Sequence, residues 1–524
     1  MRKTVVIPTY WGRKKEIGWQ PGDIVYDHPT PIDEPGTLLR TLESMKILSQ
    51  RDFKLVILIC PTTESIEKEA EEKVKQIIEK ADLHIETYIF TNQDLKKIKE
   101  ICERKGMQKE ITKLLSLNGY ANVRNMCLYT AHVLSADVVI LIDDDEIFEN
   151  PNFISMATEF IGKRIYGESI FGVAGYYLNK HDAYYDDVNI EPWMTYWDRF
   201  GSKAKAFDKI IGCEPRLKHT PFAFGGAMVI HKNLYQIVPF DPHITRGEDI
   251  DYVINSKMFG FNFYLDNRLS IKHLPPPKNH PVWQRFREDI YRFLYEREKI
   301  RSQYEVSNMH RVSAEDFDPY PGEFLKDDLE DKIFKTNVLL ALEYLADGDI
   351  DACKESLKNI FISKYEAIPK KDPFSQYRKI QKDWEKLMDF TIQNRYEIRK
   401  VMEQHNLSKT EIQVDEQHTR ILTLPEIKEI IKKTSGFEAF HDSEIEKIAN
   451  ISQIKTYMED EIIFREGGKD STFFIILKGC VRIFKWNEKN EEIILANLQK
   501  GEVMGETAIV NEIYFANAKA AEFT

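Results

Sequence analysis

The first half of the chain alternates short aliphatic runs with amphipathic segments, and this alternation limits the fold more than any other feature of the sequence. Four runs rich in β-branched residues are expected to be strands, at residues 4–8, 54–60, 84–90 and 138–142. Helical patterns lie between them, as at residues 64–80 and 122–134. Strands alternating with helices are typical of a largely parallel sheet covered by helices, so we predict a Rossmann-like mixed α/β domain over residues 1–282.

The rest of the chain has two further sequence patterns. Residues 283–433 are heavily charged and follow a helical period, which predicts an α-helical middle region. Residues 434–524 change to short strands punctuated by glycine, which predicts an all-β roll. The strands expected there are residues 461–464, 472–477, 480–485 and 492–498.

Charge and hydropathy exclude two classes of protein. The chain has 73 Lys and Arg residues against 85 Asp and Glu residues, a net charge of −12, so it lacks the basic surplus of a nucleic-acid-binding protein. No run of the sequence approaches the roughly 20 apolar residues of a transmembrane helix. Its six cysteines have no metal-binding spacing and fit a reducing compartment. We therefore expect a cytoplasmic protein without a nucleic-acid partner or a transmembrane segment.

Three consecutive carboxylates, Asp143, Asp144 and Asp145, follow the strand predicted at residues 138–142. A strand ending in this way places them at the carboxyl edge of the sheet, where open α/β folds bind their ligands. Carboxylate oxygens suit Mg²⁺ or Mn²⁺ carrying a diphosphate. Taken alone, the triplet fits a solvated acidic turn before the helix that follows Pro151 equally well.

Three ordered blocks of the sequence resemble the GT-A glycosyltransferases, and among them the inverting family 2. The blocks are residues 4–10, residues 117–125 with 141–145, and residues 224–227 with 246–251 and 272–273. Together they span most of residues 1–275. The resemblance implies a GT-A fold and the metal-dependent, hexosyltransferase-like transfer of a sugar from a nucleotide-sugar donor to a carbohydrate or other hydroxyl acceptor. It also implies inversion at the anomeric carbon.

The resemblance assigns roles to particular residues. The residues implied to bind the donor are Pro8, Thr9, Tyr10, Arg124, Asp143, Asp144, Gly225 and Gly226. The metal ion, Mn²⁺ or Mg²⁺, would be held by Asp143, Asp145 and His273, provided that the last strand of the sheet returns to the acidic edge. Asp249 would take the proton of the acceptor hydroxyl, with Glu248 as its acidic neighbour.

The same residues have structural interpretations that the sequence leaves open. Glu248 and Asp249 would also offset the dipole of a helix that begins there. Gly225 and Gly226 fit a tight turn as well as a close approach of the backbone to a ligand. Arg124 could pair with the acidic triplet and hold its shape instead of binding phosphate.

Two groups of aromatic residues are expected near the site. Seven lie between the second and third blocks and would form an acceptor wall or simply pack an irregular insert: Tyr176, Tyr177, Tyr184, Tyr185, Trp193, Tyr196 and Trp197. Trp11, Trp19 and Tyr26 lie in or beside an insertion at residues 12–36 and would frame the donor pocket. Only Glu64 stands near the place where the family has an acidic residue for the nucleotide base, so the base is not identified.

Residues 437–523 resemble a cyclic-nucleotide-binding β-roll, a second family. Its phosphate cassette would be Gly505, Glu506, Thr507 and Ala508. The family's phosphate-binding arginine is missing, because residues 513–518 contain none, and an uncompensated buried phosphate is costly. We expect a truncated roll that serves as an interaction module rather than a cyclic-nucleotide site. The alternative is that Lys519 or the helical middle supplies the missing charge.

A competing interpretation of the whole chain is a non-catalytic regulatory or binding protein. In that case the GT-A-like body and a degenerate cyclic-nucleotide-binding-like module would both be binding platforms. The acidic motifs, all of which are retained, favour an enzyme. The missing cassette arginine indicates that at least one module has drifted.

Overall fold

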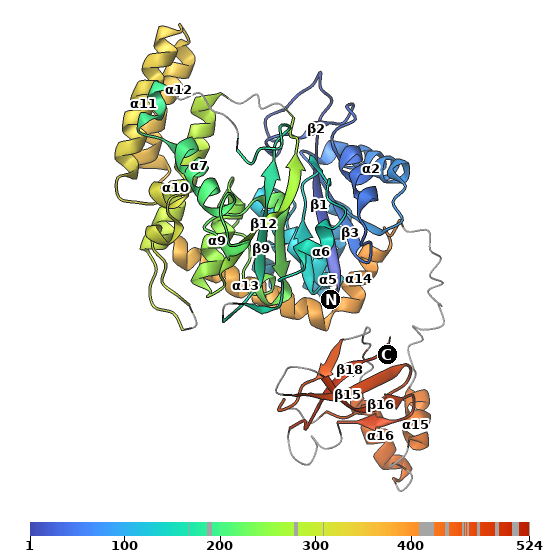
Figure 1. The fold of residues 1–524 in the computed structure, drawn as a ribbon. Coiled ribbons are helices and arrows are strands. Elements are labelled where there is room, and N and C mark those ends of the chain that lie inside the picture. The colour runs from blue at the N-terminus through green and yellow to red at the C-terminus, as the bar shows by residue number, and fades with distance from the viewer. Residues whose placement is uncertain are drawn as a thin grey trace. The chain divides into compact units, whose positions relative to one another are not determined.

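The computed structural model divides the chain into two compact units, Met1–Lys409 and Thr410–Thr524 (Figure 1). It describes all residues of the chain except 166, 186–190, 277–280, 308, 408–423, 435–436, 438–439, 453–454, 456, 458–460, 469–471, 488–491, 506–512 and 523. No helix of this described part is long and apolar enough to cross a lipid bilayer.

A ten-stranded sheet forms the centre of the first unit, counted over the described residues. Its main strands, in spatial order, are β10 (Leu217–His219), β12 (Phe263–His273), β9 (Gly172–Leu178), β11 (Met228–His231), β5 (Val138–Leu141), β1 (Lys3–Gly12), β3 (Lys54–Pro61) and β4 (Glu86–Phe90). Strands β5, β1, β3 and β4 are parallel, whereas β11 is antiparallel to both of its neighbours. Two short strands complete the sheet: β2 (Thr30–Pro31) pairs with β1, and β6 (Glu146–Ile147) pairs with β12. The predicted mixed sheet is confirmed.

Helices cover both faces of this sheet, and alternate residues of each central strand enter different cores. Val5 and Ile7 of β1 pack into one core, and Val6 packs into the other. Strands that are buried on both faces have continuous apolar sequences, which explains why they could be predicted from the sequence. The helices of the N-terminal part are α1 (Leu38–Ser44), α2 (Glu67–Ala81), α3 (Asn92–Arg104), α4 (Lys109–Thr112), α5 (Tyr120–Val133), α6 (Phe153–Ala157), α7 (Arg199–Ile210), α8 (Lys232–Tyr235) and α9 (Glu248–Met258). A two-stranded ribbon, β7 (Arg164–Ile165) and β8 (Glu168–Ser169), lies outside the main sheet.

The helices between residues 282 and 403 belong to the same compact unit as the sheet. They are α10 (Val282–Arg301), α11 (Leu329–Ala346), α12 (Ile350–Phe361), α13 (Pro373–Gln393) and α14 (Arg395–Glu403). Helix α13 packs on the body through Trp384, whose Nε1 donates to the Tyr235 carbonyl at 2.8 Å, and Tyr377, whose hydroxyl donates to the Pro239 carbonyl at 2.8 Å. The boundaries predicted at residues 282 and 433 remain predictions.

In its described residues, the second unit contains a small β structure and two helices. The helices are α15 (Leu424–Lys433) and α16 (Asp442–Ile451), and α16 is a helix within the part of the sequence predicted to be all-β. The larger sheet of the second unit has the strand order β13 (Ile462–Phe464), β18 (Asn517–Ala520), β15 (Cys480–Trp486) and β16 (Glu492–Gln499). Strand β14 (Phe474–Ile475) pairs with β17 (Val503–Met504). Gly505 has a left-handed φ of 80°, and the predicted cassette residues Glu506, Thr507 and Ala508 lie outside the described residues.

Candidate functional site

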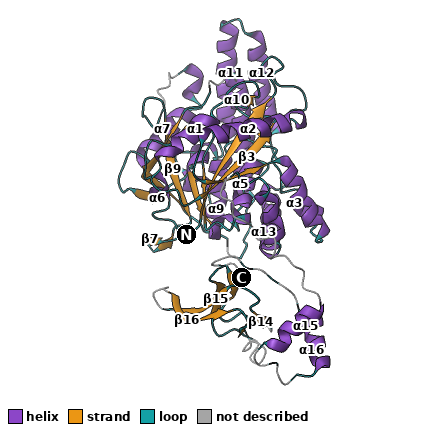
Figure 2. Cartoon of the chain, turned by 90° about the vertical axis from the view of Figure 1, so that its right-hand side faces the viewer, coloured by secondary structure: helices purple, strands orange, loops and turns teal. Residues whose placement is uncertain are grey.

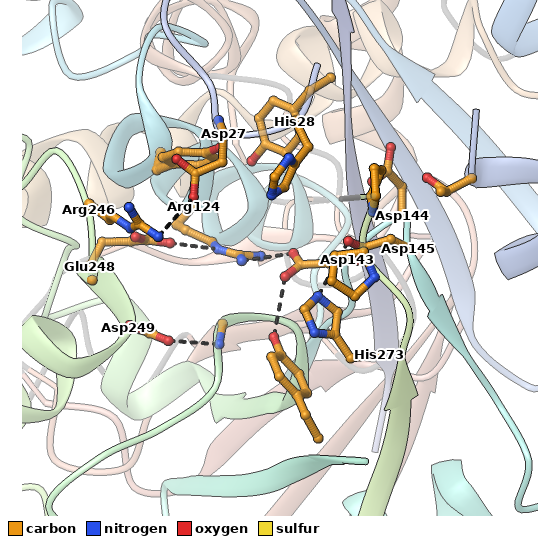
Figure 3. A pocket seen from close by; sticks show the side chains of 18 of the residues that line it. Asp27, His28, Arg124, Asp143, Asp144, Asp145, Arg246, Glu248, Asp249 and His273 are labelled. Atoms are coloured by element: carbon orange, nitrogen blue, oxygen red, sulfur yellow. Dashed lines mark hydrogen bonds and ion pairs between the residues drawn. The ribbon is translucent and has the colours of Figure 1, made fainter. Parts of the chain in front are cut away.

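A cavity of about 270 Å³ opens at the carboxyl ends of β1 and β5 (Figure 3). Its lining is rich in charged groups and combines carboxylates with guanidinium groups. The charged residues that line it are Asp27, Arg124, Asp143, Asp144, Asp145, Arg199, Arg246, Glu248, Asp249, Asp289 and Arg292. The site therefore collects seven acids and four arginines from segments spread along the sequence.

Each carboxylate of the acidic triplet has a different partner. Asp143 forms an ion pair with Arg124, with Oδ1 at 2.8 Å from Nη2. Asp144 accepts a hydrogen bond of 2.6 Å from the Thr9 hydroxyl. Asp145 lies 3.3 Å from Nε2 of His273. The turn after β5 thus sends three neighbouring side chains toward β1, α5 and β12.

These surroundings give the triplet unequal proton affinities. Burial, followed by the charge of Asp145, raises the pKa of Asp144 to about 8, although the Thr9 hydrogen bond acts in the opposite direction. Burial would also raise the pKa of Asp145, but the hydrogen bond and charge of His273 outweigh it and leave that pKa lowered. Of these two acids Asp145 is therefore the more readily ionised, and Asp144 is the one that more readily takes up a proton.

His273 reaches the triplet because β12 returns to the acidic edge. Its strand pairs antiparallel with β6, and His273 lies opposite Glu146 in the register. The imidazole stacks on Tyr177 with ring centroids 4.4 Å apart, and the Tyr177 hydroxyl lies 3.3 Å from Oδ2 of Asp143. The assignment of His273 required the last strand of the sheet to return to the acidic edge, and β12 does return there.

The arrangement is not a preformed metal cluster. Among the described residues, no three His, Cys, Asp or Glu side chains are grouped closely enough to hold an ion. Asp143 is paired with Arg124, so it does not converge with Asp145 on one ion site. The chemistry of the donor set nevertheless fits a hard divalent cation, since the buried Oδ1 of Asp145 accepts no hydrogen bond from the described part of the chain.

Arg124 of α5 connects the triplet to the second acidic pair. Its guanidinium is buried, and Nε lies 3.4 Å from Oε1 of Glu248 while Nη2 holds Asp143. The two glycines of the third sequence block make room for such side chains. A Cβ on Gly225 would lie 2.4 Å from Nη2 of Arg124, and one on Gly226 would lie 1.9 Å from Oε1 of Glu146. The glycines are required by protein side chains, a role that the sequence did not indicate.

Glu248 and Asp249 begin α9 after Gly247, which has a left-handed φ of 75°. Asp249 accepts hydrogen bonds from two backbone N–H groups, those of Gly225 at 3.1 Å and Ile250 at 2.8 Å. Burial raises the pKa of Asp249. Burial, and then the charge of Asp249, raises the pKa of Glu248 to about 7 against the opposing effect of Arg124. The negative charge of Asp249 therefore favours the protonated form of its neighbour Glu248.

A second cavity of about 920 Å³ adjoins the first. The two share Tyr177, Asp249, His273 and Pro275, so Asp249 lies where they meet. The phenylalanine and tyrosine rings along the second cavity are Tyr177, Tyr184, Tyr185, Phe207, Phe222, Phe224 and Tyr320. An aromatic-lined cavity next to a charged one suits a ligand with ring faces and hydroxyl groups.

The predicted aromatic wall is only partly found there. Tyr177, Tyr184 and Tyr185 line the second cavity, whereas Trp193 and Trp197 are buried at 5% and 2% exposure and belong to the core. Trp197 packs against Phe286, Phe293 and Phe324. Packing of the insert therefore uses the larger rings.

The prediction that the aromatic residues in or beside the insertion at residues 12–36 frame the donor pocket is wrong. Trp11 and Tyr26 are buried in the cores, and Trp19 is 58% exposed, so these rings do not line the cavity in the described structure. The insertion contributes Asp27 and His28 to the lining instead. Trp11 packs into the core that contains Ile7, and Tyr26 packs into the core that contains Val6.

Not every residue assigned to the donor reaches the cavity wall. Tyr10, Arg124, Asp143, Asp144 and Gly225 line it. The other three, Pro8, Thr9 and Gly226, lie outside the lining, although Thr9 holds Asp144 from behind. The side chain of Glu64 is 85% exposed and lies 3.6 Å from Lys96, away from the cavity.

Sequence reasoning missed three of the four arginines. Arg246 lies 3.4 Å from Asp27 and also contacts Glu288, while Arg199 pairs with Asp289. Arg292 donates to the Tyr320 hydroxyl at 3.1 Å. Asp289, Arg292 and Glu296 follow a helical spacing along α10, and all three are buried. In the sequence this line of polar residues looks like an exposed helix face, and it lay beyond the predicted domain boundary, so Arg292 was not assigned to the site.

Comparisons with known proteins identify the end of the chain. Residues 454–524 match the cyclic nucleotide-binding domain family. The chain is 30% identical over 99 residues to cGMP-dependent protein kinase 2 of Mus musculus, covering 18% of this chain and 13% of that protein. It is 31% identical over 85 residues to the cAMP-dependent protein kinase regulatory subunit of Mycosarcoma maydis, covering 16% of each. These matches show a C-terminal cyclic nucleotide-binding domain, and they span only a small part of the relatives.

A solved structure resembles a larger part of the chain. It is the mannosyltransferase PcManGT from Pyrobaculum calidifontis in complex with GDP-Man and Mn²⁺. The similarity covers 74% of this chain and 86% of that one, at 13% sequence identity and a TM-score of 0.37.

Proposed function

We propose that the first unit is a metal-dependent glycosyltransferase that moves a sugar from a nucleotide-sugar donor to an acceptor hydroxyl. The observation that carries this proposal is the position of Asp249 where the two cavities meet. One cavity has the acids and arginines suited to a metal-bound diphosphate, and the other has the aromatic faces suited to a sugar acceptor. The ordered sequence blocks that resemble the GT-A glycosyltransferases support the same activity.

The acidic edge would receive the donor diphosphate. Asp143, Asp145 and His273 would hold Mn²⁺ or Mg²⁺, which when bound neutralises charge on the diphosphate. Arg124 would then turn from its pairing with Asp143 toward the phosphate oxygens, where a guanidinium can donate two hydrogen bonds. Tyr10 and Gly225 would line the nucleotide side of the cavity.

Asp249 would act as the general base. Its carboxylate takes the proton of the acceptor hydroxyl while the acceptor oxygen bonds to the anomeric carbon. The bond from that carbon to the diphosphate breaks, and the nucleoside diphosphate leaves with the electron pair. A single displacement inverts the anomeric configuration. Glu248, with a pKa of about 7, would share the proton with Asp249 after the transfer.

A donor-hydrolysis screen tests the activity most directly. The purified full chain is incubated with a panel of nucleotide sugars and Mn²⁺, and the released nucleoside diphosphate is measured. We expect release that depends on the metal and is lost in Asp249→Asn, while that variant still binds the donor. Absence of release with every donor, together with unchanged donor binding in Asp145→Ala, would favour the competing interpretation of a non-catalytic binding protein.

For the second unit we propose an interaction module built on the cyclic nucleotide-binding fold. The match over residues 454–524 supports that fold. Lys519 is an unsuitable replacement for the missing arginine, because its Nζ lies 2.7 Å from Glu492 and it is largely buried. We therefore propose that this unit does not hold cAMP or cGMP by itself.

A further inference from the structure

Helices α11 and α12 form a hairpin that stands out from the body of the first unit (Figures 1 and 2). The second half of α12 and the segment after it expose four large apolar side chains. Leu357 is 42% exposed, Phe361 63%, Tyr365 73% and Ile368 41%. Together with Lys358, Lys364, Lys370 and Lys371, we call these side chains the α12 patch.

In α12 the large apolar side chains Leu357 and Phe361 face solvent, the reverse of the usual arrangement in a surface helix. Its buried side chains are small or polar, namely Ala352, Ser356 and Asn359. Asn359 donates to the Trp283 carbonyl and to Oδ1 of Asn337 in α11, both at 3.0 Å, so polar contacts join this helix to its neighbours. A surface helix normally turns its apolar stripe toward the core. The exposed apolar residues of α12 are therefore not required for packing of the unit, and an exposed apolar surface of this kind marks an interaction site.

Basic side chains surround these apolar residues. Lys358, Lys364, Lys370 and Lys371 are exposed, and Glu366 is the exposed acid among residues 357–371. Lys364 reaches over the ring of Phe334, 46% exposed on α11, with Nζ 5.8 Å from its centroid. An apolar surface with flexible lysines at its border is typical of proteins that lie on membranes.

The acids of the hairpin turn do not cancel this charge. Asp347, Asp349 and Asp351 lie at the opposite end of α12 from Lys364. At about 1.5 Å per residue the helix separates Asp351 from Lys364 by roughly 20 Å. That separation is about twice the Debye length at physiological ionic strength, so the charge of Lys364 is screened from these acids.

We propose that the α12 patch docks the protein on the surface of an anionic lipid bilayer. Leu357, Phe361 and Tyr365 enter the boundary between head groups and acyl chains, and the lysines remain among the lipid phosphates and carboxylates. Two properties of the patch favour lipid over a protein partner. The patch is flanked by cations of the sign that anionic lipid attracts, and its most exposed side chains are aromatic rings of the kind that settle at a bilayer interface.

Vesicle co-sedimentation of the full chain tests this docking. Vesicles of phosphatidylcholine alone are compared with vesicles that also contain phosphatidylserine, at low and high salt. We expect binding to the second kind only, weakened by salt because lysine contacts are screened. Leu357→Ser with Phe361→Ser should reduce binding by roughly tenfold or more. Lys358→Gln with Lys364→Gln should remove the preference for phosphatidylserine.

Matched controls separate docking from a general effect of apolar surface. Ile17→Ser and Ile47→Ser change exposed apolar residues elsewhere, at 49% and 42% exposure, and should leave vesicle binding unchanged. All variants alter exposed positions, so thermal melting should stay at the wild-type value. Because the proposal does not depend on glycosyl transfer, the donor-hydrolysis screen neither supports nor weakens it.

Three results would overturn the proposal. One is wild-type protein that does not sediment with phosphatidylserine vesicles. Another is binding that the patch variants retain at full strength. A third is a wild-type oligomer, seen by light scattering, that the Leu357 and Phe361 variants dissociate, since that result would assign the patch to a second copy of the chain.

Discussion

Arg124 occupies the centre of the site, and the two carboxylates it contacts belong to different parts of the chain. It reaches Asp143 at 2.8 Å and Glu248 at 3.4 Å from a buried position. A lysine could not replace it, because a single ammonium on a flexible stem cannot direct two separate nitrogens at two acids. The planar guanidinium keeps the acidic triplet and the acid pair on facing walls of one cavity.

The role of Asp249 as the proposed base gives a first prediction. Asp249→Asn keeps the shape of the side chain and removes its ability to accept a proton. We expect turnover to fall by roughly 10²–10⁴ while donor affinity stays near the wild-type value. Steady-state kinetics and donor calorimetry measure the two quantities. Retained turnover, or a product with the anomeric configuration of the donor, would exclude the assignment.

The proposed metal ligands give a second prediction. Asp145→Ala and His273→Ala should each abolish the part of donor affinity that depends on Mn²⁺, because both remove a ligand from the same edge of the sheet. Calorimetry with and without Mn²⁺ measures the difference. Glu149→Ala is the matched control, since Glu149 pairs with Lys272 at 2.7 Å and does not line the cavity. If all three variants bind the donor like the wild type, the ligands have been misassigned.

At the scale of elements, a buried ion cluster fixes α9 against α10. Lys299 of α10 is fully buried, and its Nζ lies 3.1 Å from Asp241 and contacts Asp251, two residues after Asp249. Removing one partner of a buried ionic group leaves the other charges uncompensated. The orientation of the acid pair in the cavity therefore depends on a cation that lies outside it.

Lys299→Met should destabilise the first unit by about 3–5 kcal/mol, because Asp241 and Asp251 lose their common partner. Urea unfolding followed by tryptophan fluorescence measures the loss. The triple variant that also carries Asp241→Asn and Asp251→Asn should recover part of it, since the uncompensated charges are then absent. A single variant that unfolds like the wild type would show that water reaches these carboxylates.

The contact between α5 and α13 predicts a dependence of stability on pH. His132 is buried, and its Nε2 donates to the Met388 carbonyl at 3.0 Å. Burial, followed by the charge of Arg395, lowers its pKa to about 3. The unfolded chain takes up this proton near pH 6.5 and the folded protein does not, so stability present above pH 6.5 is lost as the pH falls toward 3.

The expected loss from this histidine is about 1.4 kcal/mol for each pH unit below 6.5. His132→Gln keeps a hydrogen-bond donor and removes the titration, so the acid dependence of unfolding should become shallower by that slope. Unfolding between pH 5 and pH 7 checks it. His231, whose pKa is lowered to about 4 by burial, remains in both proteins and contributes equally. Identical slopes would contradict the assignment.

The central strands can be predicted well from the sequence, and the residues that line the cavity less well. Strands such as β3 and β5 are buried on both faces, so their composition alone identifies them. The triplet and His273 lie at the ends of strands and the acid pair lies at the start of a helix, so they could be predicted to converge. Arg292 and Asp289 could not, because their role depends on how α10 packs against α9. The aromatic residues of the insertion were misread, since a ring beside a site and a ring in a core look alike in sequence.

At the scale of the whole molecule, the second unit supplies a prediction about cyclic nucleotides. Millimolar cAMP or cGMP should leave the melting temperature of the full chain unchanged, because residues 513–518, where the family's arginine is expected, contain no arginine or lysine. A ligand at 100 times its Kd would stabilise the unit that binds it by about 2.7 kcal/mol, which melting would detect. Ala516→Arg is the gain-of-function comparison and should introduce a response. A shift in the wild-type protein would show that another group neutralises the phosphate.

The pairing of β12 with β6 has a consequence for how this protein folds. The site brings together residues separated by long stretches of chain, such as Arg124 and Glu248, which are 124 positions apart. Closing such loops costs entropy before any contact repays it, and topologies of this kind fold slowly. The cavity cannot form until the last strand has entered the sheet. After dilution from denaturant, donor binding should therefore return with the slowest refolding phase, later than the helical signal.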